Sequence, residues 1–231
     1  MADTTHTVEA AHGHHGHSLA LRHHFASREQ QKEASTLGMW VFLVTEVMFF
    51  GGMFLAYVVY RSWYPEAFAA ASHHLDLVLG AFNTAVLIGS SLTMALAVRA
   101  AQLGARRGLM LFLILTMALG SVFLVVKGFE WHHKYVENHI PGPNFHYEGP
   151  LAGNVQLFFS LYFGMTGLHA FHMVIGLGLL GTLLYFAWRG KYTAEYNTPI
   201  DMAGLYWHFV DIVWIFLFPL LYLIDRHTGG H

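Results

Sequence analysis

Long runs of apolar residues, separated by short polar stretches, dominate the chain after its first 35 residues. A transmembrane helix needs about 20 consecutive apolar residues, and each run is close to that length or exceeds it. The fourth run is the longest, which implies a tilted helix or one with a protruding end. The five runs cover residues 38–60, 77–98, 109–127, 157–188 and 203–224. The pattern therefore predicts an all-α, polytopic membrane protein built as a bundle of five transmembrane helices.

The composition of the 231 residues agrees with a membrane protein: 55% are hydrophobic and 11% charged, and the mean hydropathy is +0.43. Charged residues make up about a quarter of an average soluble domain, so that class is excluded. The formal net charge of −2 gives no basis for binding nucleic acid. The chain contains no cysteine, which excludes disulfide bonds, thiolate catalysis and thiolate metal sites.

Lysine and arginine are distributed unevenly between the two sides of the predicted bundle. Eight of them fall in the N-terminal tail and in the connections after the second and fourth runs, against four on the opposite side. Positively charged residues are enriched in cytoplasmic segments. The sequence therefore predicts a cytoplasmic N-terminus and a C-terminus outside.

Two polar segments stand apart from the apolar runs. Residues 1–35 include seven histidines without the fixed spacing of metal ligands, and they are predicted to form a disordered, His-rich cytoplasmic tail. Residues 36–231 then form the five-helix membrane domain. The connection over about residues 128–156 contains Pro141, Pro143 and Pro150, which break a helix. A loop of that length is expected to be functional or to serve as a docking surface.

Ionisable side chains inside the apolar runs are the main functional candidates, because a charge in a bilayer is costly and is usually paired. They are Glu46, His169, His172, His208 and Asp211, with Lys127 and Glu130 at the end of the third helix. Depth follows from a rise of about 1.5 Å per residue from the predicted helix ends. This count places Glu46, His208 and Asp211 in a layer near the cytoplasmic face, and the other four in an outer layer.

These positions leave three interpretations open. The first is a membrane cytochrome with histidine axial ligands, but the depth count places His208 in a different layer from His169 and His172. The second is a transporter that relays protons through buried carboxyl groups, although no inverted repeat or pair of matching broken helices is visible. The third is that the polar groups satisfy one another and hold the helices together.

Four segments occur in an order that resembles a known family. They are STLGMWVFLVTEVMFFGGMF, KGFEWHHKY, TGLHAFHMVIG and GLYWHFVDIVWIFLF. The last two are the most specific, with His-x-x-His inside one and YWHFVD inside the other. Over residues 36–222 the chain is similar to the cytochrome c oxidase subunit III family of the haem–copper terminal oxidases.

The resemblance implies a non-catalytic subunit of an aerobic respiratory oxidase that couples oxygen reduction to proton pumping. It implies no catalytic, cofactor-binding or metal-binding residue in this chain, with haem and copper in partner subunits. The expected partners are subunit I as main contact, subunit II, small subunits and membrane phospholipid. The implied tasks are to stabilise subunit I, bind lipid and support proton uptake, in the bacterial cytoplasmic membrane. A quinol oxidase or nitric oxide reductase complex, and a proton-coupled transporter, remain alternatives.

By the same resemblance, Glu46 matches the family's carbodiimide-reactive intramembrane glutamate. The family's other polar positions correspond to Glu130, His169, His172, His208 and Asp211. The chain departs from the family in one respect, since many members have seven helices and this sequence has five apolar runs. The two further helices would precede Thr36. The five-helix form is similar to bacterial members of the family, in some of which subunit I carries the further helices.

Overall fold

The structure is a computed structural model that describes residues 27–142, 145–147 and 151–224. Within these residues the only non-helical pairing is an isolated bridge between Thr193 and Tyr196. The helices are α1 (Arg28–Trp63), α2 (Pro65–His73), α3 (Leu77–Gln102), α4 (Arg106–Val136), α5 (Ala152–Trp188) and α6 (Thr198–Tyr222). All of them except α2 are long and apolar enough to cross a membrane, which confirms the predicted all-helical, five-span class.

The helix ends differ from the predicted limits because hydrogen bonding along a helix continues past the apolar run. Helix α1 begins at Arg28, and the hydroxyl of Ser27 accepts a hydrogen bond from the Gln30 amide at its start. Residues 28–35, assigned to the tail from sequence, are therefore helical, and residues 1–26 lie outside the described part. Helix α4 continues to Val136, well into the predicted outer loop. The short helix α2, which starts at Pro65, was not predicted.

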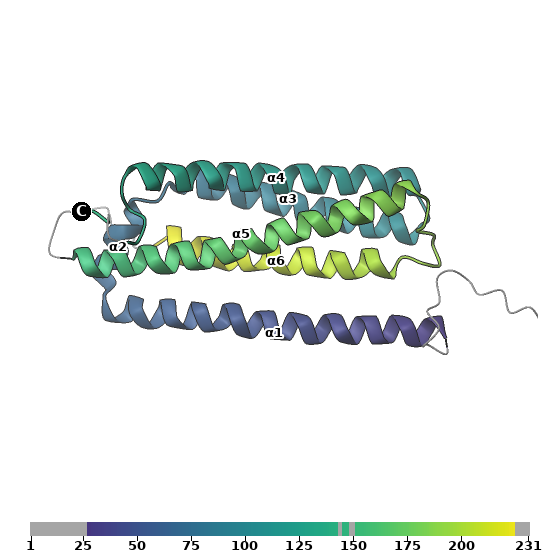
Figure 1. Ribbon diagram of the computed structural model, residues 1–231, viewed down its shortest axis with the longest axis horizontal. Coiled ribbons are helices and arrows are strands. Elements are labelled where there is room, and N and C mark those ends of the chain that lie inside the picture. Colours follow the sequence, from purple (N-terminus) through teal and green to yellow (C-terminus); the bar gives the residue numbers. More distant parts are fainter. Residues whose placement is uncertain (1–26, 143–144, 148–150, 225–231) are drawn as a thin grey trace, which may run out of the picture.

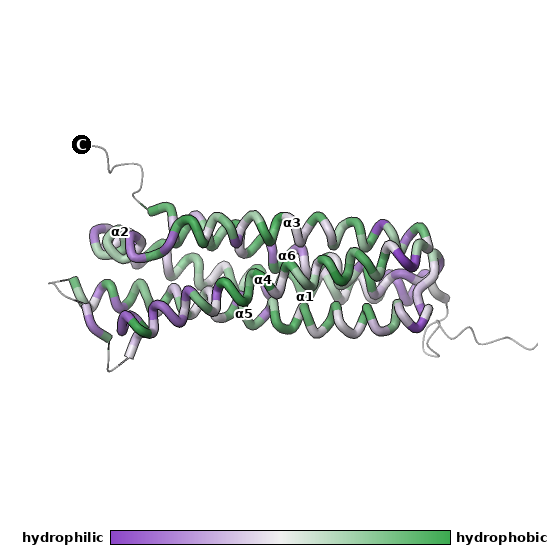
Figure 2. The backbone as a smooth tube through the Cα atoms, turned by 90° about the horizontal axis from the view of Figure 1, so that it is seen from above, coloured by the Kyte–Doolittle hydropathy of each residue, from purple (hydrophilic) through white to green (hydrophobic). Residues whose placement is uncertain are grey.

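The five long helices lie side by side along the long axis of the molecule, and α2 sits at one end (Figure 1). Helix α3 packs on α4 and α6, α5 packs on α4 and α6, and α1 lies at the side of the bundle against α6 and α5. Apolar residues predominate along the middle of the helices and polar residues gather toward the two ends (Figure 2). This is the pattern of a bundle whose sides face hydrocarbon and whose ends face water.

A tryptophan occupies the centre of the packing. The Trp207 side chain is 1% exposed, and its indole Nε1 donates a hydrogen bond to Ser90 Oγ at 2.9 Å. Gly120 of α4 and Gly176 of α5 lie against its ring, and a Cβ added at either would come within 2.8 and 2.9 Å of indole carbons, respectively. Small residues let membrane helices approach closely, so these glycines make room for the indole between three helices.

Candidate functional site

A buried ion pair lies toward the end of the bundle that holds α2. Lys127 Nζ is 3.0 Å from Glu130 Oε2, and the two side chains are 2% and 3% exposed. They are three residues apart on α4, which places them on one face of that helix. The hydroxyls of Tyr162 on α5 and Tyr222 on α6 donate to Glu130 Oε1 at 2.7 and 2.5 Å. Lys127 also donates to both hydroxyls, at 3.1 and 2.5 Å.

This Lys127–Glu130 network gives each of its two charges several partners. The ammonium also lies 4.8 Å from the centre of the Trp214 ring, where the face of the indole attracts a cation. A buried charge pair is tolerated when further hydrogen bonds satisfy both ions. The network therefore joins α4, α5 and α6 through one set of polar contacts. The sequence analysis did not predict the two tyrosines, because its candidates were acidic and basic side chains alone. A hydroxyl group inside an apolar run was the signal that could have identified them.

The second polar site joins α1 to α5. His172 Nε2 lies 3.2 Å from Glu46 Oε2, within ion-pair distance but poorly aligned for a hydrogen bond. His172 Nδ1 is 2.8 Å from the Leu168 carbonyl oxygen, which can only accept, so Nδ1 carries a proton. The Tyr206 hydroxyl donates to the His172 carbonyl at 3.0 Å. Glu46 and His172 Nε2 therefore compete for one further proton, as carboxylate with imidazolium or as two neutral groups.

The predicted layers of polar groups are wrong in one respect, because Glu46 pairs with His172 and not with His208 or Asp211. The depth count took the start of the apolar run as the start of the helix. Since α1 begins at Arg28, Glu46 lies about 27 Å along it. His172 lies about 24 Å from the Trp188 end of the antiparallel α5, so the two side chains meet about halfway along the length of the bundle.

The remaining histidine of α5 has a different environment from His172. The His169 ring is fully buried, with ring centroids 5.3 Å from Phe123 and 5.1 Å from Trp214. Neither of its nitrogens has a hydrogen-bond partner among the described residues. The shared helix face therefore does not bring His169 and His172 into one site.

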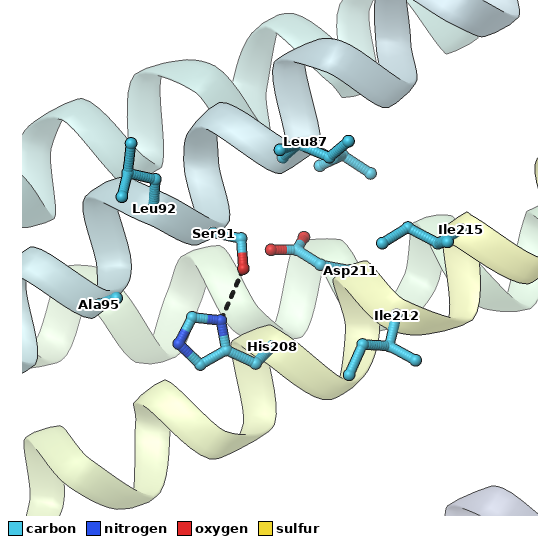
Figure 3. Close-up of a pocket in the computed structure, with 9 residues that line it drawn as sticks. Leu87, Ser91, Leu92, Ala95, His208, Asp211, Ile212 and Ile215 are labelled. Carbon is cyan, nitrogen blue, oxygen red and sulfur yellow. Dashed lines mark hydrogen bonds between the residues drawn. The ribbon is translucent and has the colours of Figure 1, made fainter.

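His208 and Asp211, by contrast, do line one hollow between α3 and α6. Ser91 Oγ is 2.7 Å from His208 Nδ1, and the Asp211 carboxyl points toward the same serine (Figure 3). Figure 3 also shows that His208 and Ser91 come from facing helices, so their hydrogen bond joins α6 to α3.

The histidines do not form the facing pair that axial ligation of a haem requires. His172 points to Glu46 on α1, His208 to Ser91 on α3, and His169 is enclosed by aromatic rings. Across residues 27–142, 145–147 and 151–224, no group of three or more His, Asp or Glu side chains is placed to hold a metal ion. Within the described residues these three histidines therefore do not face one another across a common site.

A cluster of titratable groups lies outside the membrane-spanning segments at the α2 end. Glu137 contacts Lys134, His133 and His139, at 2.5, 3.1 and 3.2 Å. Partial burial opposes ionisation of Glu137, but the hydrogen bond and charge of Lys134 outweigh it and lower its pKa. The His74 ring packs 5.2 Å from the His139 ring and 5.8 Å from the Tyr147 ring. Partial burial, then the charges of His139 and Lys134, lower the pKa of His74.

This cluster is expected to lose stability on acidification. A depressed histidine pKa means that the unfolded segment binds the proton more readily, so stability falls as the pH drops below His74's ordinary value of 6.5. The contribution of Glu137 is lost only at lower pH, below its ordinary 4.5. Hydrogen-exchange protection of the His146 amide, which bonds the Asn138 carbonyl, measures this opening. His74→Gln should abolish the loss of protection that begins below pH 6.5, and the control His132→Gln should leave it in place. An unchanged dependence of protection on pH in His74→Gln would contradict the assignment.

Comparisons with known proteins identify the family to which the sequence is similar. The family model described as cytochrome c oxidase subunit III matches residues 22–225. Cytochrome c oxidase subunit 3 of Synechocystis sp. is 34% identical over 226 residues, which are 96% of this chain and 83% of that protein. Cytochrome c oxidase subunit 3 of Thermostichus vulcanus is 32% identical over 91% of this chain and 96% of its own length. The probable quinol oxidase subunit 3 of Staphylococcus haemolyticus is 29% identical, over 88% and 96% respectively. With its five apolar spans and this match along nearly its whole length, the chain belongs to the cytochrome c oxidase subunit III family.

Proposed function

We propose that this chain is the non-catalytic subunit III of an aerobic terminal oxidase in a bacterial cytoplasmic membrane. It stabilises subunit I, binds membrane phospholipid and supports proton uptake. Haem and copper lie in the partner subunits, where oxygen is reduced, and subunit II and small subunits complete the complex. The N-terminus faces the cytoplasm and the C-terminus the outside. Membership of a terminal-oxidase subunit family supports the complex, and the lysine and arginine distribution supports the orientation.

One observation carries the scaffold role: most of the intramembrane ionisable groups join helices of this chain. The Lys127–Glu130 network joins α4 to α5 and α6, Glu46 and His172 join α1 to α5, and His208 joins α6 to α3. When ionisable groups pair within a bundle, the free-energy cost of placing them in hydrocarbon falls, and the pairs fix the arrangement of the helices. This supports a subunit whose polar groups maintain a shape against which subunit I packs.

The Glu46–His172 pair supports the role in proton uptake. The Glu46 side chain is 18% exposed, and the flank of α1 around it is rich in exposed apolar residues such as Val47 and Met48. The pair therefore lies near the lipid-facing surface of the bundle and not at its centre. One proton can move between the two partners while the net charge of the pair stays at zero, so the pair can hold a proton near this surface.

Purification of the full chain from native membranes tests the proposed function. An affinity-tagged chain should bring with it haem and copper in constant ratio, together with larger membrane subunits. The same chain expressed alone should show no Soret band. A Soret band in the isolated chain would overturn the proposal and would favour a haem-binding membrane cytochrome. A tagged chain that never brings haem and copper would also overturn it and would favour the transporter alternative.

A quinol-oxidizing complex is the second candidate, because the Staphylococcus haemolyticus relative is named a probable quinol oxidase subunit 3. The purified complex distinguishes the two donors directly. Oxygen consumption with reduced cytochrome c and not with a quinol identifies the cytochrome c oxidase type. The opposite result identifies the quinol oxidase type.

Replacing Glu46 with alanine is expected to leave the complex able to reduce oxygen, but the complex should inactivate after fewer turnovers. The change removes the partner of His172 and weakens the attachment of α1 by about 1–3 kcal/mol, the usual cost of an unsatisfied buried polar group. The number of turnovers before inactivation should fall severalfold, with the haem spectrum unchanged. Glu46→Gln, which keeps the size and one hydrogen-bond acceptor, should lie between wild type and alanine. A perturbed oxygen-site spectrum would instead place Glu46 in the catalytic machinery.

A further inference from the structure

A hollow of about 230 Å³ lies at the corner where α1 ends and α2 begins, next to the start of α5. These three helix ends meet at the end of the bundle that holds α2 (Figure 1). The lining includes Trp63 and Tyr64 from the corner, Glu66 from the first turn of α2, and Leu151 and Asn154 from the start of α5. Trp63 is 65% exposed and Tyr64 37% exposed, so both rings remain accessible from outside the bundle. We call this feature the corner hollow.

The corner hollow lies at the depth of the lipid head groups. The apolar run of α1 covers residues 38–60, and Trp63 lies about 21 Å beyond the middle of that run. The hydrocarbon core extends about 15 Å to each side of the bilayer centre, and the head groups occupy roughly the next 5–7 Å. Tryptophan and tyrosine are enriched at this level of membrane proteins. The groups that meet the corner hollow from the bilayer are therefore lipid head groups.

The lining favours a cation that donates hydrogen bonds. Among its described residues Glu66 carries the only charge, and none is a lysine, arginine or histidine. A carboxylate can only accept hydrogen bonds, and the side-chain carbonyl of Asn154 also accepts. The faces of tryptophan and tyrosine rings attract cations as well. A primary ammonium group satisfies these acceptors, whereas an anionic head group would meet the Glu66 carboxylate without a positive partner.

We propose that the corner hollow binds the head group of a phospholipid that ends in a primary ammonium, as phosphatidylethanolamine does. The ammonium donates to the Glu66 carboxylate beside Trp63, and the acyl chains lie along α1, where Leu55 and Val58 are 65% and 50% exposed. Because the hollow is lined from α1, α2 and α5, the bound head group also joins the corner to the start of α5. The inference rests on the proposed function, which includes phospholipid binding, and gives it a site and a lipid class.

Native mass spectrometry of the purified complex tests the inference. Delipidated complex is titrated with phosphatidylethanolamine, phosphatidylcholine or phosphatidylglycerol of identical acyl chains, and the bound lipids are counted. Glu66→Gln and Trp63→Ala should each weaken the tightest phosphatidylethanolamine binding by about tenfold, because a hydrogen bond to a charged group or a cation–ring contact is lost. Neither variant should weaken the binding of phosphatidylglycerol. Phosphatidylethanolamine binding that is unchanged in both variants would overturn the proposal.

Matched controls lie at the opposite end of the same helices. Glu33→Gln changes an exposed carboxylate of α1, and Trp188→Ala changes an indole of α5 that is 63% exposed; neither should affect the titration. Equal binding of phosphatidylcholine and phosphatidylethanolamine by wild type would contradict the requirement for a hydrogen-bond donor. Displacement of the lipid by free phosphoethanolamine would assign the hollow to a soluble amine and overturn the proposal.

Haem and copper, measured in the same samples, test the proposed function separately. If the chain brings no haem or copper but its phosphatidylethanolamine binding still depends on Glu66 and Trp63, the oxidase assignment fails and the corner hollow stands. If haem and copper are present and the two variants bind the lipid as wild type does, the corner hollow fails and the oxidase assignment stands.

Discussion

Replacing Glu130 with leucine is expected to be the most damaging single change in this chain. It leaves the Lys127 ammonium inside the bundle without a counter-ion and removes the acceptor of two tyrosine hydroxyls. Breaking a buried pair by removing one partner costs about 3–5 kcal/mol. The variant should accumulate poorly in the membrane, and its unfolding in detergent should occur at a much lower temperature than that of wild type.

The double variant Lys127→Met/Glu130→Leu separates the loss of the pair from the burial of a lone charge. Replacing both partners of a buried ion pair by apolar residues of similar volume is often neutral or stabilising. The double variant should therefore recover most of the stability lost in Glu130→Leu. Tyr222→Phe, which removes only hydrogen bonds, should cost about 1 kcal/mol. If the double variant unfolds as early as the single one, the damage is due to lost packing and not to the unpaired ammonium.

Gly176→Ala is expected to destabilise the centre of the bundle by overpacking it. The new methyl group would lie 2.9 Å from the Trp207 ring and 3.2 Å from the Tyr206 ring, and the indole is held in place by its bond to Ser90. Overpacking of a filled core costs about 1–3 kcal/mol. Thermal unfolding of the purified chain in detergent measures the loss.

Gly178→Ala is the matched control, because it lies on the same helix and its added methyl group meets nothing within 4 Å. Alanine favours a helix over glycine by about 1 kcal/mol, so this variant should be as stable as wild type or more so. A smaller ring in Trp207→Phe should relieve the crowding, and the cost of Gly176→Ala should shrink in that background. Equal losses for the two glycine variants would show that the indole is not the obstacle.

The number and type of the main elements could be predicted because they depend on local properties of the chain. An apolar run long enough to cross a membrane must satisfy its own backbone, and a helix does so within the segment. All five long helices follow from that requirement. The ends of these helices could not be predicted from the apolar runs, since polar residues such as those at 28–35 and 128–136 continue a helix beyond the hydrocarbon. Helix α2 is short and marked by little more than Pro65, so its pattern was not distinguishable from a loop.

The identity of the polar candidates was likewise available from the sequence, because an ionisable residue inside an apolar run is conspicuous wherever the helix lies. Their partners depend on the rotation and axial position of each helix, which hydropathy does not encode. Glu46 therefore appeared to belong with His208 and Asp211, while the tertiary structure pairs it with His172 across the α1–α5 contact. Packing also selected Tyr162 and Tyr222 as partners of Glu130. The sequence by itself determined five helices and the charges within them; only the packing of those helices decided which charges are satisfied inside this chain.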